Sequence, residues 1–372
     1  MRTETTFTVG CLHRGMQKIA FLCGARHWED TEVNLLNCAK AFSEKGYDVN
    51  IFCLQNTPLY KEATAGNLTV IPIKEHRKYF DLFAAQRLIF LLEKQQITHL
   101  FIFRSSDIGI SAMVKSFLKR PVDITFFLSA ESGFMKRFLM RHYHFRQLDH
   151  IICSLNVQKE EICTTINRND LKIKVIPPMV PFEENQTVWK KTEARKVLNL
   201  PERKKIFGFI ATEGNDKAQQ FLFSALKQLN RPDLLICLLD KTDKQVCRKR
   251  VKTNSLDDKI TVLSYRKEED LFFHAIDVFI SIPSNGAFEF KMLEAISFGK
   301  QVLTDDGAGN QEILDNGTFG FLYERRNEQS LAEKMVSSGC SELAQEVVKT
   351  FLKEHGTTTF LNQAEAFLSL KK

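Results

Sequence analysis

The sequence contains no long hydrophobic run. No window approaches the ~18 uninterrupted apolar residues that a membrane-spanning helix needs. The first fifteen residues carry two arginines but no apolar segment of the kind that a signal peptide requires, and we expect residues 1–15 to be a disordered leader. These absences predict a cytoplasmic protein whose contact with a membrane is limited to a peripheral one at the inner face.

Metal-binding and disulfide patterns are also missing. The nine cysteines are an odd number, and the sequence has no C-x-x-C pair, no H-E-x-x-H motif and no D-x-D at the end of an apolar strand. Neither a disulfide framework nor a zinc site is predicted, and we expect no bound metal. Several cysteines stand in apolar runs that are typical of buried thiols, which favours a reducing compartment.

The bulk composition is that of a globular protein with more than one core. A chain of 372 residues suits two domains. The hydrophobic content of 44% and the charged content of 26% are ordinary for such proteins. The net charge of +7 is a modest bias that fits anionic ligands such as nucleotides or phospholipid headgroups.

Strand and helix patterns alternate along both halves of the chain. Residues 18–22 read as a buried strand, and residues 32–44 have apolar positions at helical spacing. Three prolines within residues 177–181 exclude a sheet or a helix there and mark a boundary. We predict an α/β protein with two doubly wound, Rossmann-like domains that face a cleft, in residues 16–180 and 181–345. The final helices, in residues 346–372, are expected to cross back to the first domain.

Four short patterns follow one another near the end of the second half. Residues 276–283 are an apolar strand, and the helix after it begins near Lys291 and carries Glu294. A turn with Gly307 and Gly309 follows the next strand and leads to Glu312. In an open α/β sheet such turns lie at the carboxyl ends of strands, where nucleotides bind.

This order resembles the donor-nucleotide half of the large retaining glycosyltransferase family 4, which has the GT-B fold. The resemblance implies a hexosyltransferase that moves a sugar from a nucleotide-sugar to a glycan or lipid-linked acceptor, in the synthesis of a cell-surface polysaccharide or lipopolysaccharide. It implies that the reaction needs neither a metal nor a cofactor. Because no protein nucleophile is evident, the leaving phosphate itself is expected to take the acceptor proton. The partners it implies are small molecules and glycans, with no nucleic acid.

Glu294 matches the second of two glutamates that the family separates by seven intervening residues, and this glutamate contacts the donor ribose. Gly286 stands where the first glutamate is expected, and Glu289 is out of register. Some members carry a lysine three residues before the second glutamate, and Lys291 fits that variant. The alternatives are a glutamate that the helix dipole favours and a solvated lysine at the start of a helix.

Lys217 matches a lysine that binds the donor diphosphate in the family. The arginine that precedes it there falls at Ala211 or Thr212, so this cation is missing. The helix N-terminus and the N–H groups of the loop can supply part of the positive charge that the missing arginine would provide. The resemblance therefore assigns Lys217 and Glu294 to catalysis, and the alternative for Lys217 is an exposed lysine in a first helical turn.

The remaining donor contacts that the resemblance implies surround these two residues. They are Gly286, Phe288, Lys291, Thr212, Tyr265, Arg266, Gly307, Gly309 and Glu312. Base selection is expected to rest on backbone contacts near residues 263–266. Glu312 has two open interpretations, a contact with a donor hydroxyl or a cap of its own helix.

The first half offers weaker candidates on the phosphate or acceptor side. Members of the family often have a histidine after the strand equivalent to residues 123–128, and here Ser129 follows that strand. The loop after the first strand has one glycine, Gly24, followed by Arg26 and His27. Arg104 and Asp107 follow another strand at the same edge of the sheet. The alternative for each is an ordinary surface loop.

Residues 134–146, from Phe134 to Arg146, interleave basic and large apolar side chains. Such a segment can lie on an anionic membrane with its aromatic residues inserted, and family members with lipid-linked acceptors carry similar segments. The alternative is an amphipathic helix with its apolar side in the core.

Two other functions stay open at this stage. The missing glutamate, arginine and histidine motivate a non-catalytic GT-B protein that binds a nucleotide, a glycan or a partner glycosyltransferase. A nucleotide-sugar epimerase of the same fold is the second alternative.

Overall fold

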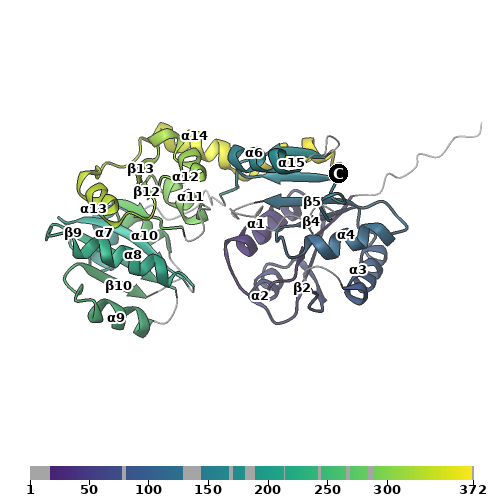
Figure 1. Ribbon diagram of the computed structural model, residues 1–372, viewed down its shortest axis with the longest axis horizontal. Helices are drawn as coiled ribbons and strands as arrows, with labels where there is room; N and C mark the ends of the chain where they lie inside the picture. The colour runs from purple at the N-terminus through teal and green to yellow at the C-terminus, as the bar shows by residue number, and fades with distance from the viewer. Residues whose placement is uncertain are drawn as a thin grey trace, which may run out of the picture.

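The computed structural model describes residues 17–77, 81–128, 144–166, 171–180, 189–212, 214–241, 244–264, 269–283 and 288–370. The expected leader at residues 1–15 lies outside these ranges. The chain forms two lobes, each an open sheet with helices on both faces (Figure 1). Among the described residues, no helix is both long enough and apolar enough to cross a membrane.

The first lobe is built on a seven-stranded parallel sheet with the order β3-β2-β1-β4-β5-β6-β7. The strands are β1 Lys18–Cys23, β2 Asp48–Leu54, β3 Thr69–Ile73, β4 His99–Ile102, β5 Asp123–Leu128, β6 His150–Cys153 and β7 Lys172–Val175. The central strands are buried along almost their whole length. This burial is expected when helices cover both faces of a parallel sheet.

Five helices are described in this lobe, and capping residues mark the ends of several of them. They are α1 Asp30–Glu44, α2 Pro58–Ala65, α3 Leu82–Lys94, α4 Ile108–Phe117 and α6 Asn156–Thr165. Helix α1 ends just before Gly46, which adopts a positive φ of 95°, a conformation that glycine tolerates at little cost. Helix α2 starts with Pro58, and the Thr57 hydroxyl accepts the N–H of Tyr60 as an N-cap.

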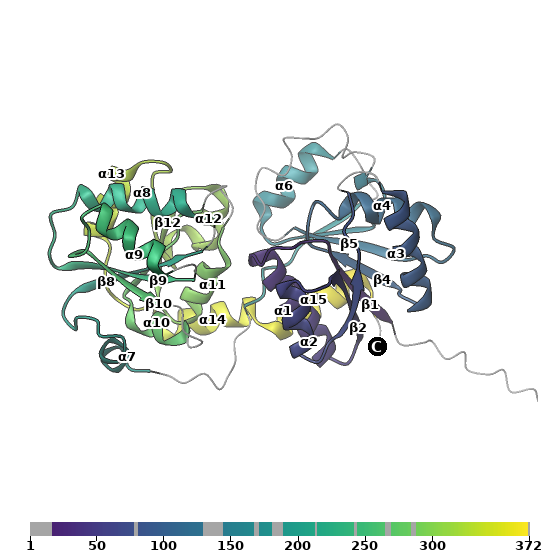
Figure 2. The ribbon, with the colours of Figure 1, turned by 90° about the horizontal axis from the view of Figure 1, so that it is seen from below.

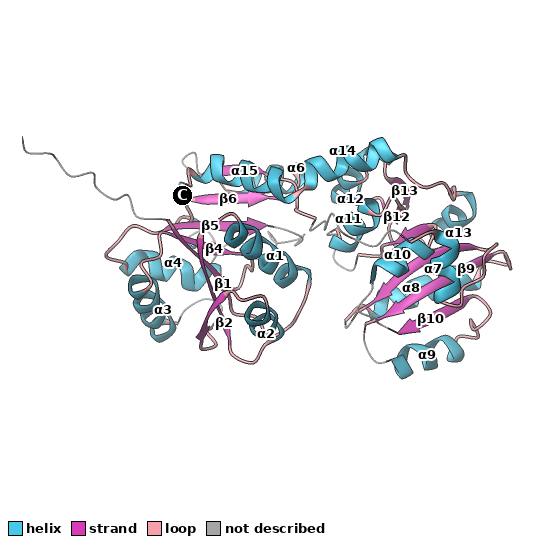
Figure 3. Cartoon of the chain, turned by 180° about the vertical axis from the view of Figure 1, so that it is seen from behind, coloured by secondary structure: helices cyan, strands magenta, loops and turns pink. Residues whose placement is uncertain are grey.

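The second lobe has a six-stranded parallel sheet with the order β10-β9-β8-β11-β12-β13. Its strands are β8 Lys205–Ala211, β9 Leu234–Asp240, β10 Ile260–Ser264, β11 Val278–Ile280, β12 Gln301–Asp305 and β13 Gly320–Tyr323. Its helices are α7 Lys191–Val197, α8 Asp216–Lys227, α9 Lys244–Thr253, α10 Glu269–Ala275, α11 Phe290–Ser297, α12 Ala308–Ile313 and α13 Glu328–Ser337. Figure 3 shows both sheets from behind with helices on either side. The predicted class, two doubly wound α/β domains, is confirmed.

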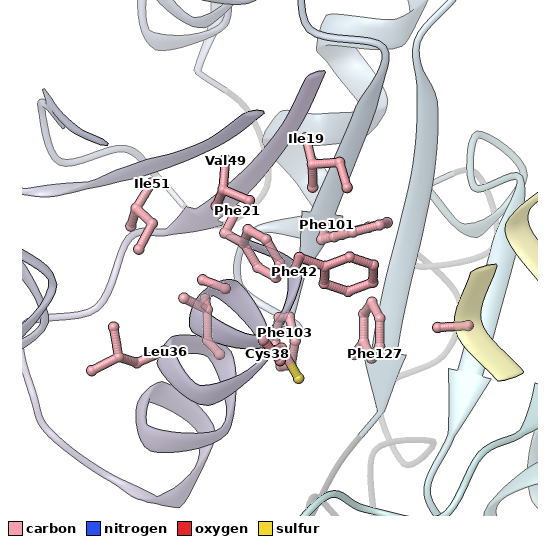
Figure 4. Close-up of a cluster of buried hydrophobic side chains, with 14 of the residues drawn as sticks. Ile19, Phe21, Leu36, Cys38, Phe42, Val49, Ile51, Phe101, Phe103 and Phe127 are labelled. Carbon is pink, nitrogen blue, oxygen red and sulfur yellow. The ribbon is translucent and has the colours of Figure 1, made fainter. Parts of the chain in front are cut away.

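A cluster of aromatic side chains fills one face of the first sheet (Figure 4). Phe103 and Phe127 stack with their ring centroids 4.6 Å apart, and Phe21 meets Phe101 edge to face at 5.2 Å. Offset or edge-to-face pairs of this kind add to the free energy gained by burial. Phe360 joins the cluster from the C-terminal end of the chain, 6.2 Å from Phe127.

The two C-terminal helices run from the second lobe to the first (Figure 2). Helix α14 (Gln345–His355) buries Phe351 in the core of the second lobe, and α15 (Thr357–Leu368) packs in the core of the first. Glu365 fixes α15 by accepting hydrogen bonds from Tyr47 Oη and Lys45 Nζ, both at 2.7 Å. The exact limits at residues 180 and 345 stay predictions.

Loops at the carboxyl ends of the two sheets touch each other. The Phe290 N–H, after β11, donates to Asp30 Oδ2, after β1, at 3.1 Å. A second contact joins Glu312 of α12 to the start of α6. The carboxyl ends of the two sheets therefore face each other across these two contacts.

Candidate functional site

Four charged side chains of alternating sign form a chain at the carboxyl edge of the second sheet. Lys241 follows β9, Glu269 begins α10, and Lys291 and Glu294 lie in α11. Lys291 Nζ lies 2.8 Å from Glu269 Oε2 and 2.5 Å from Glu294 Oε2, and Lys241 forms an ion pair with the other oxygen of Glu269. Each side chain is about one-fifth exposed. We call these four residues the charged chain.

Burial and neighbouring charges shift the pKa of every side chain in the charged chain. Burial raises the pKa of Glu294, and the Lys291 ammonium offsets part of that rise. Burial lowers the pKa of Lys291, but the carboxylates of Glu294 and Glu269 raise it by more. Burial and the nearby Lys291 lower the pKa of Lys241. The two cations and two carboxylates compensate one another, which makes their partial burial tolerable.

Glu294 keeps one carboxylate oxygen available. Lys291 occupies Oε2, and no other described residue donates a hydrogen bond to Oε1. This carboxylate lies at the edge of the sheet where a ribose is expected, so Oε1 can accept a hydroxyl while Oε2 stays paired. Lys291 is held by two carboxylates, which differs from the solvated lysine of the alternative interpretation.

Lys217 lies in the first turn of α8, after β8. Both Lys217 and Thr212 are exposed. No described residue forms an ion pair with Lys217, whereas its neighbour Asp216 is paired with Arg250 at 2.5 Å. A free ammonium beside the N–H groups of a helix N-terminus is a combination that favours an anion.

Lys241 is a cation that the sequence reasoning missed. Its backbone N–H donates to the Ala211 carbonyl at 2.9 Å. The backbone of Lys241 therefore lies next to Ala211, one of the two positions where the family has its arginine. The signal in the sequence was its place directly after a buried strand, at the same edge as Lys217. Its ammonium contacts Glu269, so it lies at the expected site already neutralised.

The turn before α12 is organised by the buried carboxylate of Asp305. Asp305 Oδ1 accepts the Gly307 N–H at 3.0 Å and the Asn310 amide at 2.6 Å. Gly307 and Gly309 do not require a positive φ. A Cβ added to Gly309 would lie 3.1 Å from Leu155 Cδ1, so the close approach at this glycine is to the first lobe.

Glu312 caps a helix of the other lobe, a role that neither sequence-based interpretation included. Its Oε1 accepts the N–H and the side-chain amide of Asn156, at 2.7 and 2.8 Å, and its Oε2 accepts the Val157 N–H at 3.1 Å. These are orphan donors at the N-terminus of α6. The sequence motif could not reveal a partner 156 positions away.

Glu289 occupies the lobe interface although its position is out of register with the family motif. Its Oε2 accepts the Ser281 hydroxyl at 2.8 Å. Burial raises the pKa of Glu289 to about 7, and the charges of Asp30 and Asp305 add to the rise. Burial also raises the pKa of Asp30. A carboxyl group that titrates near neutral pH therefore lies where the two lobes meet.

Phe288 is a core residue. Its side chain is 2% exposed and lies 5.3 Å from the Phe290 ring. Its predicted donor contact is therefore restricted to the backbone.

In the first lobe, Asp107 joins three loops. Its Oδ2 accepts the Gly24 N–H at 3.2 Å, and its Oδ1 lies 3.1 Å from His76 Nε2. A Cβ added to Gly24 would lie 2.5 Å from the same His76 nitrogen, so only glycine fits. His76, which is 4% exposed, was missed by the sequence reasoning because the loop after β3 carries no motif.

The predicted cations of the first lobe have different surroundings. Arg104 Nη1 lies 2.6 Å from Glu32, whose carboxylate is fully buried, and its charge is neutralised there. Arg26 pairs with Glu75 at 2.6 Å on the surface. His27 is exposed. The structure thus gathers Gly24, Asp107 and Arg104 at the edge of the sheet, with Arg104 in an internal ion pair.

Several predicted residues lie outside the described parts of the chain. These are Gly286, Tyr265, Arg266 and Ser129, together with residues 134–143 of the basic aromatic segment. At the described end of that segment, Phe145 is 1% exposed and packs in the core. In the described residues, no group of three or more His, Cys, Asp or Glu side chains could hold a metal ion.

Two Rossmann-like lobes whose strand ends meet at one interface define the GT-B class. Two family models match the chain: "Glycosyl transferase 4-like" at residues 18–156 and "Glycosyl transferases group 1" at residues 190–337. The chain belongs to the glycosyltransferases of the family 4-like, group 1 type and is a divergent member. The predicted resemblance and the enzyme class are confirmed, and the assignment disfavours the non-catalytic alternative.

Solved structures of the same fold cover nearly all of the chain. The Anabaena protein Alr3699/HepE in complex with UDP and glucose has a TM-score of 0.76 at 16% identity, with 95% of this chain and 99% of that chain covered. A glycosyltransferase from Rickettsia africae gives 0.74 at 16% identity, with 95% and 99% covered. The sucrose-phosphate synthase of Thermosynechococcus elongatus gives 0.73 at 14% identity, again with 95% and 99% covered. No curated protein sequence matches the chain.

Proposed function

We propose that the protein is a retaining hexosyltransferase that moves a sugar from a nucleotide-sugar to a glycan or lipid-linked acceptor, in the synthesis of a cell-surface polysaccharide or lipopolysaccharide. The observation that carries the proposal is that the charged chain and the exposed Lys217, which has no ion-pair partner among the described residues, both lie at the carboxyl edge of the second sheet. The fold shared with HepE, which was solved with UDP and UDP-glucose, supports the choice of donor.

In this proposal the two ends of the nucleotide are held by different groups. Glu294 accepts a ribose hydroxyl on Oε1 while Lys291 holds Oε2. Lys217 and the N–H groups at the start of α8 receive the diphosphate, because the positive end of a helix favours an anion. Lys241, Gly307 and Gly309 lie at the same edge and complete the donor side.

The chemical step follows from where charge develops. As the glycosidic bond to the diphosphate breaks, negative charge grows on the leaving oxygen, and Lys217 stabilises it. The acceptor hydroxyl attacks on the face that the diphosphate leaves, and its proton passes to the leaving phosphate oxygen. The proposal needs no metal and no cofactor.

The acceptor side is proposed for the edge of the first sheet around Gly24 and Asp107. The lipopolysaccharide outer core galactosyltransferase WaaB has the same fold, with a TM-score of 0.68 at 14% identity and 95% of this chain and 99% of that chain covered. This likeness supports a cell-surface glycan as the product. Peripheral contact with a membrane fits a lipid-linked acceptor.

Thermal-shift measurements with UDP, GDP, ADP, CMP and their common sugar conjugates test the donor site. We expect one nucleotide to stabilise the protein and Glu294→Ala to lose the effect. The activity test compares Lys217→Ala with Lys227→Ala, a lysine at the far end of the same helix. We expect Lys217→Ala alone to lose at least ~10-fold in kcat/KM, about 1.4 kcal/mol. Equal losses in both variants, or conversion of the donor without an acceptor, would contradict the proposal.

A further inference from the structure

Three phenylalanines on the outer side of the first lobe are exposed to solvent. Phe83 and Phe90 of α3 are 75% and 62% exposed, and Phe117 at the end of α4 is 61% exposed. Figures 1 and 2 both show α3 and α4 next to each other, on the side of this lobe that faces away from the second lobe. Exposed aromatic residues gathered on one side of a protein mark an interaction surface more often than isolated ones do.

The exposed residues of α3 recur at helical spacing. Phe83, Gln86, Arg87, Phe90 and Lys94 are all exposed, and positions three and four apart lie on one side of a helix. The opposite side, with Ala85, Leu88 and Leu92, is buried in the core. Helix α3 therefore presents a second apolar stripe that its own lobe does not use.

Unpaired cations accompany the phenylalanines. Arg87 and Lys94 share the exposed stripe of α3, and Lys119 and Arg120 follow Phe117. No described residue forms an ion pair or side-chain hydrogen bond with any of these four cations. The carboxylates of α3 are placed differently, because Asp81 accepts the Ala84 N–H as the N-cap and Glu93 is half-buried.

We propose that this surface, made by the exposed stripe of α3 and the end of α4, docks on an anionic lipid bilayer. Aromatic side chains that enter the headgroup region and cations that meet anionic lipids are the two attractions that hold peripheral proteins at membranes. The charge of the surface selects the partner, because all four free side chains are cationic.

Co-sedimentation of the full chain with vesicles tests the docking. The probes are vesicles of phosphatidylcholine alone and vesicles in which about one-third of the lipid is phosphatidylglycerol. We expect binding only to the anionic vesicles, with weakening as salt is raised because the charges are exposed. Failure to bind the anionic vesicles at low salt would overturn the proposal.

Surface variants identify the contact. Each cation lost should weaken binding about fivefold, so Arg87→Gln/Lys94→Gln should lose roughly 25-fold, and Phe83→Ser/Phe90→Ser should lose tenfold or more. The matched control is Val197→Ser/Val336→Ser, two exposed apolar residues of the second lobe, 43% and 40% exposed, which should bind as the wild type does. Unchanged binding in both α3 variants would overturn the proposal.

A protein partner is the competing outcome. If Phe83→Ser/Phe90→Ser converts a dimer to a monomer in light scattering while vesicles are not bound, the surface serves self-association and the proposal is wrong. Nucleotide-induced thermal stabilisation, measured on the same variants, should stay at the wild-type value. That readout separates failure of the docking from failure of the proposed reaction.

Discussion

The two sheet edges that meet between the lobes are built in opposite ways. At the edge of the second sheet, the charged chain holds ionised groups of both signs that are still partly exposed. At the edge of the first sheet, one fully buried carboxylate, that of Asp107, ties three loops together by hydrogen bonds. The charged chain of the second sheet can exchange its partners for a charged ligand. Asp107 of the first sheet keeps loops in place.

The difference matters because desolvation of a charged group costs more free energy at the edge of the first sheet than at the edge of the second. A buried carboxylate without its donors has no solvent to replace them, whereas a partly exposed ion pair regains water when it opens. We therefore expect substitutions at the first edge to affect stability, and substitutions at the second edge to affect ligand binding at a smaller cost in stability.

Asp107→Ala should give the largest effect. It leaves the Gly24 N–H and the buried His76 without their acceptor, and losses of this kind cost about 3–5 kcal/mol. The measurement is the free energy of unfolding from urea titration. Asp233→Ala is the control, since Asp233 pairs with Arg231 on the surface and its loss should change little. Equal destabilisation of both variants would remove the proposed difference between the edges.

Glu289→Gln tests the interface between the two edges. The pKa of Glu289 is raised to about 7, so the folded state binds a proton that the unfolded state has released, and wild-type stability falls as the pH rises through ~7. The amide removes this dependence, and the variant should be the more stable of the two above pH ~8, by up to about 3 kcal/mol. Urea titrations at several pH values measure it. A constant difference between the two proteins would contradict the assignment.

Lys291→Met breaks the charged chain at its centre. It leaves Glu269 and Glu294 partly buried with only Lys241 nearby, and we expect a loss of roughly 2 kcal/mol, less than for a fully buried pair. Lys349→Met is the matched control, because Lys349 also pairs with a glutamate three residues away, at 3.1 Å, but is exposed. Unfolding measurements should show little change in the control.

His76→Gln should give the smallest effect and a pH signature. Burial lowers the pKa of His76, but Asp107, the Arg77 carbonyl and Asp81 together raise it by more, so the folded pKa is above the usual value. The stabilisation is complete below the unfolded pKa of ~6.5 and is lost as the pH rises through the folded pKa. The variant should therefore be destabilised more at pH ~5.5 than at pH ~8. Taking the difference from wild type cancels the titration of the other groups.

The family motif predicted the place of the site better than the roles of its residues. Glu294 and Lys291 were found from their spacing, and both lie at the carboxyl edge where the motif places them. The motif could not show that they bind each other, because an ion pair depends on side-chain direction as well as on spacing. Lys241 and Glu269 escaped notice because their partners lie in other elements.

The membrane contact expected at residues 134–146 stays a prediction for residues 134–143, which lie outside the described ranges. At the described end of the segment, Phe145 is buried. Phe83 and Phe90 lie on α3, and the other side of this helix packs in the core. A helix with apolar residues on two sides does not reveal from its pattern which side meets the sheet.

The sequence by itself determined the order and the type of most elements. The predicted strand at residues 18–22 is β1 (Lys18–Cys23), and the predicted helix at residues 32–44 is α1 (Asp30–Glu44). Both depend on periodicity and capping, which act between residues a few positions apart. The tertiary structure alone decided that Glu312 caps α6, that Asp30 accepts the Phe290 N–H and that α15 completes the first core. Those partners are 156 or more positions apart, and only the packing of the two lobes brings such groups within reach of a hydrogen bond.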